Sequence, residues 1–212
     1  MKIYCLSGLG ADKKAFQYLT IENAELIHIE WIDPLSHESL ESYARRLFEI
    51  NIKDEQYNLM GLSFGGMLAQ EFSKLKTPEN LILISTISSR NDLPKLMKLA
   101  GAIRLHRIIP NRLIKSVNFI TRYLFGTQNP KVDQIFRQIQ KDTDPCYVKW
   151  AIDAILGWNN KEQVKGIRLH GDNDKLLPLK HNVENVIRNG GHLMLIDHSA
   201  EVSSIINQQL IR

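Results

Sequence analysis

Apolar runs alternate with helical patterns along the first 90 residues of the chain. Four runs predict strands: Lys2–Leu6, Glu25–Trp31, Tyr57–Met60 and Asn80–Thr86. Apolar side chains at helical spacing predict three helices between them: Asp12–Leu19, Ser36–Ile50 and Ser63–Lys76. The last strand run is apolar throughout, which is typical of a central parallel strand covered on both faces. This alternation predicts βαβ units and therefore an α/β fold.

The alternation stops after residue 90. From Leu93 to about Trp158 only helical patterns recur, and they break at Pro110, at residues 126–130 and at Asp144-Pro145. A run of helices without a strand, set inside an α/β chain, indicates an inserted all-helical lid.

The strand signals return after the lid. Gly166–His170 and Asn185–Arg188 predict two further strands, and Ala200–Ile211 predicts a closing helix. The chain should form a sheet of about six strands, mostly or wholly parallel, with helices on both faces. We expect residues 1–90 and 160–212 to form the core, and residues 91–159 to form the lid between the fourth and fifth strands.

Composition limits the class of protein. The 212 residues are 43% apolar and 24% charged, as in an ordinary globular domain. Cys5 and Cys146 show no motif spacing, so no disulfide framework is expected and a reducing compartment is the simpler interpretation. The first apolar run is too short for a signal peptide, and no run is long enough to span a bilayer. We therefore expect a cytoplasmic location and no integral membrane association.

Candidate chemistry begins at Ser63. It stands in Gly61-Leu62-Ser63-Phe64-Gly65, where a predicted strand meets a predicted helix. A serine held on such a sharp turn needs neighbours without a Cβ, because strand and helix crowd that point. An ordinary helix start with a capping serine and a nearby glycine would look similar.

Polar residues follow the other predicted strands. In an open α/β sheet, ligands bind beyond the carboxyl ends of the strands. The candidate segments there are Ser7-Gly8-Leu9-Gly10, Ser88-Ser89-Arg90-Asn91-Asp92, His170-Gly171-Asp172-Asn173-Asp174 and Gly190-Gly191-His192. A serine, an acid and a histidine thus follow separate strands, in that order.

Four motifs, spread over essentially the whole chain, resemble the α/β-hydrolase superfamily: the glycine loop after the first strand, Gly-Leu-Ser-Phe-Gly, His-Gly-Asp-Asn-Asp-Lys-Leu-Leu-Pro and Gly-Gly-His. The resemblance implies that fold, with its cap at the predicted lid. It also implies that Ser63 is the nucleophile and His192 the general base. The family pattern H-G-x-x-D-x-x-x-P, which ends here at Pro178, matches Asp174 to the acid. The resemblance assigns the oxyanion hole to the backbone N–H groups of Leu9 and Phe64.

The acid has two rivals. Asp172 is close to Asp174, and some family members place the acid after the fourth strand, where Asp92 lies. Motif register favours Asp174. His192 follows two glycines, which suits an exposed loop, and His170 is expected to pack or hydrogen-bond beside the acid loop.

The sequence departs from the family pattern at two points. The oxyanion loop commonly begins His-Gly, and here Ser7 stands in place of the histidine. The chain also begins directly at the strand before that loop. The first two strands of the family are therefore not expected, and the sheet should be small and wholly parallel.

The resemblance implies a serine hydrolase that cleaves a carboxylic ester of small or medium acyl chain through an acyl-enzyme. No cofactor is expected, and no residues show metal-ligand spacing. An acyltransferase or a lyase would use the same triad, and a non-catalytic ligand-binding protein on this fold would keep the same motifs.

A dinucleotide-binding protein is a second class. Gly8-x-Gly10 follows the first strand, and Glu30 lies about 20 residues on, where a ribose-binding acid would stand. The third glycine position is Lys13, so the fingerprint fails there. Nucleic-acid binding is not expected, because the basic residues are not interleaved with an aromatic platform.

The predicted lid carries the positive charge. Residues 90–160 hold twelve Lys and Arg against five Asp, a net +7, whereas the whole chain is +4. The ordinary interpretation is a solvated outer face over an apolar underside. The sharper hypothesis is a lid that attracts an anionic ester, a carrier-bound acyl group or a membrane surface.

Overall fold

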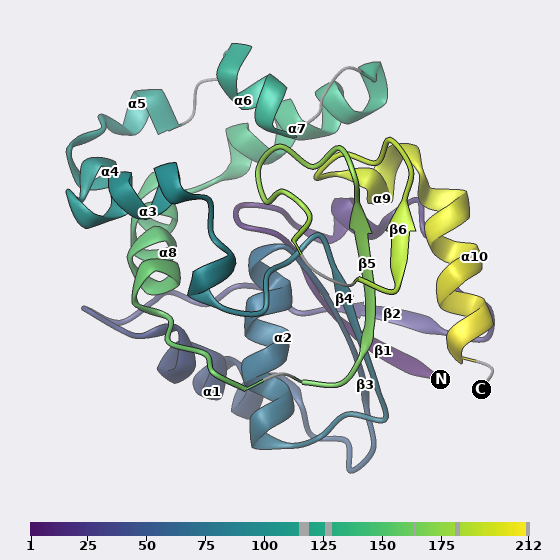
Figure 1. The fold of residues 1–212 in the computed structure, drawn as a ribbon. Helices are drawn as coiled ribbons and strands as arrows, with labels where there is room; N and C mark the ends of the chain where they lie inside the picture. Colours follow the sequence, from purple (N-terminus) through teal and green to yellow (C-terminus); the bar gives the residue numbers. More distant parts are fainter. Residues whose placement is uncertain (115–118, 126–128, 163, 181–182, 211–212) are drawn as a thin grey trace.

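The chain folds around one parallel sheet. The computed structural model describes residues 1–212 except 115–118, 126–128, 163, 181–182 and 211–212, and except the side chains of 119–121 and 131. The strands are β1 (Lys2–Leu6), β2 (Glu25–His28), β3 (Asn58–Leu62), β4 (Asn80–Ile84), β5 (Ile167–Gly171) and β6 (Asn185–Ile187). They lie in the order β2-β1-β3-β4-β5-β6, and every pair is parallel (Figure 1). The predicted α/β class and parallel six-stranded sheet are confirmed.

Alternation along the central strands divides the core into two layers. Leu59 of β3 and Leu83 of β4 belong to the cluster that packs against α1 (Leu40–Asn51) and α2 (Phe64–Leu75). Met60 and Ile82 point to the other face, where α9 (Met194–Asp197) and α10 (Ser199–Leu210) cover the sheet. Because successive side chains of a strand face opposite ways, an apolar run buried on both faces needs helices on both.

Capping residues decide where several helices begin. The helix predicted from Ser36 starts at Leu40, because the Ser39 hydroxyl accepts the Ser42 N–H at 3.2 Å. The helix predicted over Asp12–Leu19 is a short 3₁₀ turn, η1 (Lys13–Phe16), which the Asp12 carboxylate caps at Lys14. The predicted closing helix is α10; its expected last residue, Ile211, lies outside the described residues.

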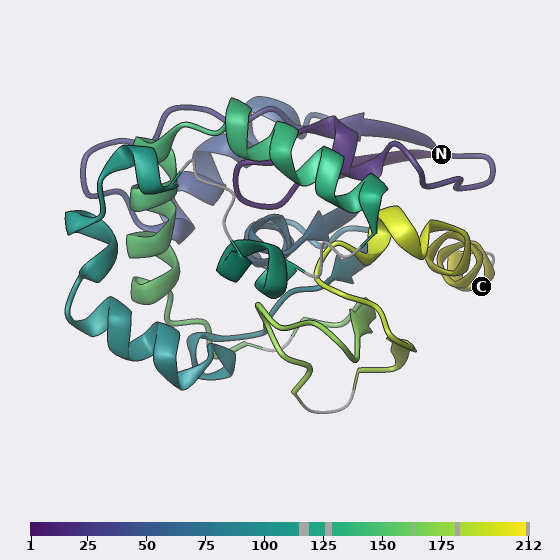
Figure 2. The ribbon, with the colours of Figure 1, turned by 90° about the horizontal axis from the view of Figure 1, so that it is seen from above.

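The predicted lid is helical over its described residues. After the 3₁₀ turn η2 (Arg90–Asp92) come α3 (Lys95–Ala102), α4 (Leu105–Ile108), α5 (Asn111–Ile114), α6 (Phe119–Phe125), α7 (Pro130–Asp142) and α8 (Pro145–Gly157). The breaks expected at Pro110 and at Asp144-Pro145 separate α4 from α5 and α7 from α8. Of the break expected over 126–130, residues 126–128 lie outside the described part. Viewed from above, the lid curves around the ends of the strands (Figure 2).

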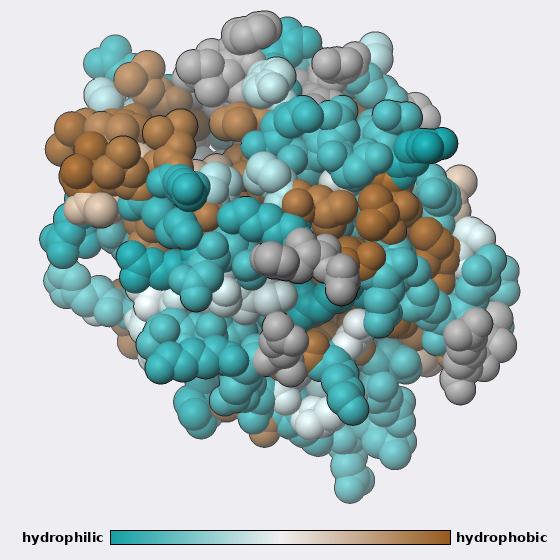
Figure 3. Space-filling model, viewed as in Figure 1, coloured by the Kyte–Doolittle hydropathy of each residue, from teal (hydrophilic) through white to brown (hydrophobic). Residues whose placement is uncertain are grey.

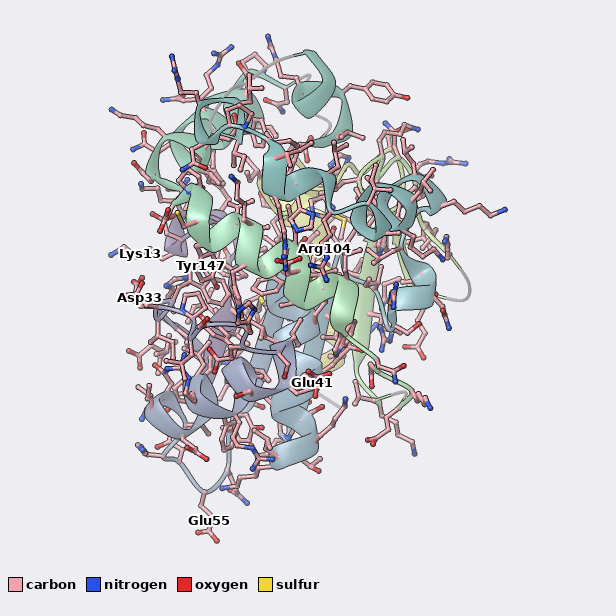
Figure 4. The ribbon with its side chains drawn as sticks, turned by 90° about the vertical axis from the view of Figure 1, so that its left-hand side faces the viewer. Lys13, Asp33, Glu41, Glu55, Arg104 and Tyr147 are labelled. Atoms are coloured by element: carbon pink, nitrogen blue, oxygen red, sulfur yellow. The ribbon has the colours of Figure 1, made fainter. Side chains whose placement is uncertain are left out.

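Aromatic side chains of α8, and Trp158 directly after it, connect the lid to the core. The Tyr147 hydroxyl, at the border of α8 and the core (Figure 4), lies 3.1 Å from that of Tyr43. The Trp150 indole N–H donates to the carbonyl of Glu38 at 2.9 Å, and that of Trp158 donates to the carboxylate of Glu71 at 2.6 Å. Each ring thus buries its apolar body while its polar tip finds a partner.

Candidate active site

Ser63 occupies a strained turn between β3 and α2. Its backbone has φ 54° and ψ −116°, a conformation that non-glycine residues rarely adopt. Two contacts from the neighbouring strand region hold it: the Ser63 N–H donates to the Ile84 carbonyl at 2.9 Å, and the Thr86 hydroxyl donates to the Ser63 carbonyl at 2.7 Å. Strain of this kind persists only where the surrounding structure enforces it, and it is typical of functional sites.

The glycines around Ser63 are required by packing. A Cβ on Gly61 would lie 2.5 Å from the Gly65 carbonyl oxygen, and one on Gly65 would overlap the carbonyls of Leu6 and Ser7. The helix therefore begins in direct contact with the ends of β1 and β3. This close approach explains the G-x-S-x-G spacing that the sequence shows.

The first prediction concerns Gly65→Ala. Because the added methyl would meet backbone rather than the end of a flexible side chain, we expect a loss of about 3 kcal/mol in the free energy of unfolding. Denaturant unfolding measures it. The matched control is Gly157→Ala, since nothing lies within 4 Å of a Cβ there. The control should be neutral or slightly stabilising, and equal stability of the two variants would contradict the packing argument.

Ser63, His192 and Asp174 form a continuous hydrogen-bonded line. The Ser63 Oγ lies 2.8 Å from Nε2 of His192, and the Nδ1 of His192 lies 2.8 Å from Oδ2 of Asp174. An ionised carboxylate can only accept, so Nδ1 carries the proton and Nε2 is left to accept from the hydroxyl. This arrangement can draw a proton from Ser63.

Asp174 is a buried carboxylate held by several donors. The backbone N–H groups of Leu176 and Leu177 each donate to its Oδ1 at 2.9 Å, and Nε2 of His170 lies 3.3 Å from its Oδ2. Burial by itself raises the pKa of Asp174, but the electrostatic interaction with His192 and these hydrogen bonds outweigh it and hold the pKa below its usual range. The carboxylate is therefore ionised at neutral pH.

The two rival acids have other partners. Asp172 accepts the Asn189 N–H at 2.6 Å. Asp92 accepts the N–H groups of Ser88 and Ser89 at 3.2 and 3.0 Å and so caps η2. The geometry thus brings Asp174 to His192 and leaves the other two carboxylates elsewhere. His170 lies beside the acid loop as expected, and its Nε2 also donates to the Leu177 carbonyl at 2.7 Å.

His192 differs from its expected environment. The two preceding glycines suggested an exposed loop, yet His192 is only 2% exposed. The chain turns directly into the short helix α9 after it, and the ring of Phe125 on α6 packs edge-on at 5.5 Å between centroids. Both contacts come from segments whose position a local pattern does not reveal.

The loop after β1 passes beside Ser63. A Cβ on Gly8 would stand 3.6 Å from that of Ser63, so the backbone of Gly8 and Leu9 approaches the serine closely. Phe64 opens α2, and the first N–H groups of a helix have no acceptor within it. We propose, as the resemblance implies, that the N–H groups of Leu9 and Phe64 form an oxyanion hole.

Side chains from distant elements support this loop. The Ser7 hydroxyl donates to the Ala11 carbonyl at 2.6 Å, and the Trp31 indole donates to the same carbonyl at 3.1 Å. Nε2 of His28 lies 3.3 Å from Ser7 Oγ, so a histidine from β2 reaches the first residue of this loop. The hydroxyl oxygen of Thr143, directly after α7, lies 3.1 Å from the Gly10 carbonyl oxygen. Sequence reasoning missed these three supports, because nothing in their local patterns marks them.

An apolar cavity of about 430 Å³ opens above Ser63 and His192. Its walls come from the loop after β1, from the turn at Ser63 and from the lid helices. The apolar side chains in its lining include Met97, Ile109, Phe136, Ile152 and Leu156. His106, Gln140 and Thr143 are the polar lid side chains in its lining, and Nε2 of His106 bonds the Asp153 carboxylate at 2.9 Å. The volume lies in the range of small-molecule sites.

No group of three or more His, Cys, Asp or Glu side chains is arranged to hold a metal ion within the described residues. Cys5 and Cys146 are free thiols, the first buried and the second exposed. None of the described helices is long and apolar enough to cross a bilayer.

Comparison with known proteins identifies the fold. No family model matches the sequence, and no curated protein matches it. Solved structures do match: an esterase from Exiguobacterium antarcticum at 17% identity, covering 100% of this chain and 92% of that one, has a TM-score of 0.77. A lipase-esterase related protein from Clostridium acetobutylicum is 16% identical over 98% and 93% of the two chains, with a TM-score of 0.73.

An extracellular α/β-hydrolase from a Paenibacillus species is similar as well. It is 13% identical, covers 98% of each chain and has a TM-score of 0.66. Likeness at such identities shows the fold and leaves the activity to be argued from the site. The chain has the α/β-hydrolase fold, with a helical insertion between β4 and β5.

Proposed function

We propose that the chain is a serine hydrolase that cleaves a carboxylic ester through an acyl-enzyme on Ser63. The observation that carries the proposal is the line of two 2.8 Å hydrogen bonds from Ser63 through His192 to Asp174. Ser63, at one end of this line, lies on a strained turn beneath an apolar cavity. A serine hydroxyl is a weak nucleophile, and these are the partners it needs for activation.

The proposed first half-reaction acylates the enzyme. Ser63 Oγ attacks the ester carbonyl carbon while His192 Nε2 takes the hydroxyl proton. The N–H groups of Leu9 and Phe64 would stabilise the oxyanion, where preorganised donors act most strongly. Collapse of the tetrahedral intermediate breaks the bond to the alcohol, which leaves with the proton from His192.

The second half-reaction returns the enzyme to its resting state. Water attacks the acyl carbonyl while His192 takes one of its protons. Collapse releases the carboxylic acid and restores the Ser63 hydroxyl. Throughout, Asp174 holds the Nδ1 proton of His192 and stabilises the imidazolium that forms transiently.

The cavity supports an apolar acyl group of small or medium length. Its lining is mostly aliphatic and aromatic, and the basic side chains of the lid that carry its net charge are largely exposed outside it. Those exposed charges would suit an ester that is anionic or is presented by an acidic carrier. The anionic character would then lie in the alcohol or carrier part and the apolar character in the acyl part.

A panel of p-nitrophenyl esters of increasing acyl length tests the proposal. We expect kcat/KM to rise by up to about fourfold for each added methylene, because each buried CH₂ contributes about 0.8 kcal/mol, and then to fall once the cavity is full. Ile152→Phe, which narrows the cavity, should shift the optimum to shorter chains, whereas Ile50→Phe on exposed α1 should not. Failure to turn over any ester would contradict the hydrolase assignment.

A further inference from the structure

Helices α3, α4 and α5 are apolar on two sides. Their inner side lines the cavity, whereas five large apolar side chains stand out into solvent. We call these five the lid face: Leu96, Leu99, Ile103, Ile108 and Leu113, which are 76%, 63%, 68%, 77% and 58% exposed. Apolar atoms gather over this region in Figure 3, at the upper left where Figure 1 places α3–α5. Contiguous exposed apolar side chains on a globular protein mark an interaction site more often than chance, so the lid face points to a partner.

The charged residues of the segment that carries the lid face are of one sign. From residue 93 to 132 the sequence contains eight Lys or Arg and no Asp or Glu. Lys95, Arg104 and Arg112 are exposed and form no ion pair within the described residues, while Arg107 pairs with Asp153 at 2.8 Å. Lys115 and the side chain of Lys131 lie outside the described part. The lid face therefore combines exposed apolar side chains with uncompensated cations.

We propose that the lid face docks on the surface of an anionic lipid bilayer. The leucine and isoleucine side chains would enter the boundary between headgroups and acyl chains, and the cations would lie among the phosphates. A second copy of the chain fits poorly, because a two-fold contact would bring the same positive charges together. Docking on a bilayer surface requires no membrane-spanning helix. It is therefore compatible with the short helices of the lid face, of which α3 has 8 residues and α4 and α5 have 4 each.

The test is sedimentation with vesicles of phosphatidylcholine, with and without phosphatidylglycerol. We expect binding to the mixed vesicles only, decreasing as salt screens the charges. Ser63→Ala should bind as well as the wild type, so membrane docking and ester hydrolysis can fail separately. Equal binding to neutral vesicles would overturn the electrostatic part of the proposal, and hence the proposal.

Two pairs of matched variants locate the contact. Leu99→Gln with Ile103→Gln should weaken vesicle binding at least about tenfold, since burying each side chain contributes more than 1 kcal/mol. The control is Ile50→Gln with Val186→Gln, two apolar residues that are 55% and 44% exposed on other elements. It should bind like the wild type, and melting temperatures check that all variants fold.

The charge pair is Arg104→Gln with Arg112→Gln. Each cation near an anionic surface contributes about 1 kcal/mol, so the double variant should bind about 25-fold more weakly. Arg45→Gln with Arg188→Gln removes the same charge from exposed sites on other elements and should have little effect. Equal losses in both pairs would contradict docking through the lid face. Absence of vesicle binding would also overturn the proposal. A dimer in light scattering, or capture by an acidic carrier protein, would then identify the lid face as a protein contact.

Discussion

Replacing Ser63 with alanine is expected to lower kcat for ester hydrolysis by about 10⁴- to 10⁶-fold and to abolish covalent labelling by a fluorophosphonate. In the proposed mechanism the hydroxyl oxygen forms the bond to the acyl group, and no other side chain in hydrogen-bond contact with His192 Nε2 among the described residues could replace it. KM should change little, because the substitution leaves intact the apolar cavity that we propose holds the acyl chain. Steady-state kinetics and gel-based labelling measure both effects.

Stability separates the chemical role of Ser63 from a structural one. Its side chain makes no capping hydrogen bond to α2, so the alanine variant should melt within a few degrees of the wild type. Ser204→Ala, an exposed position on α10, serves as the matched control and should keep full activity and labelling. Persistent labelling of the Ser63→Ala variant would show that another residue is the nucleophile.

Short sequence patterns predicted the fold and the turn at Ser63. The unbroken apolar run at Asn80–Ile84 indicated a central strand. Alternate side chains of a strand face opposite sides of the sheet, so all of them can be buried only where helices cover both faces. Gly61 and Gly65 indicated the turn at Ser63, because contacts within a few residues and with the adjacent strand ends exclude a Cβ there. These features depend on patterns shorter than one supersecondary unit.

Features that depend on distant contacts were not predictable in the same way. The burial of His192 comes from Phe125 of the lid, and the four-residue helix α9 is too short to show a period. The loop after β1 is supported by His28 and Thr143, which reach it from β2 and from the end of α7. No alternation or spacing in either segment marks that role.

The acid illustrates the boundary between the two cases. Register within the H-G-x-x-D pattern favoured Asp174 over Asp172, although both are aspartates in one short loop. The structure distinguishes them by direction: Asp174 points to His192, and Asp172 points to the backbone of Asn189. A two-residue difference in sequence thus becomes a difference in hydrogen-bond partner only through the turn that follows β5.

Asp174→Asn is expected to lower kcat by about 10⁴-fold with little change in KM. The carboxylate accepts from His192 on one oxygen and from the Leu176 and Leu177 N–H groups on the other. In asparagine the single amide oxygen stays with the two backbone donors, so the NH₂ group faces Nδ1 of His192. The imidazole must then place its proton on Nε2, where it can no longer accept one from Ser63.

Asp172→Asn is the matched control for this loss. It removes the same charge from the same loop. The partner of Asp172 is a backbone N–H, which can donate to an amide oxygen as well as to a carboxylate, so activity should stay within about threefold.

The pH dependence of stability supplies a second readout for Asp174→Asn. The pKa of Asp174 is lowered by folding, so its carboxylate stabilises the fold above the ordinary aspartate pKa of about 3.9, and this contribution is lost as the pH falls toward the lower folded value. The stability difference between the wild type and Asp174→Asn should therefore be constant above about pH 5 and shrink below about pH 4. If Asp172→Asn lost the activity instead, the acid would have to be reassigned.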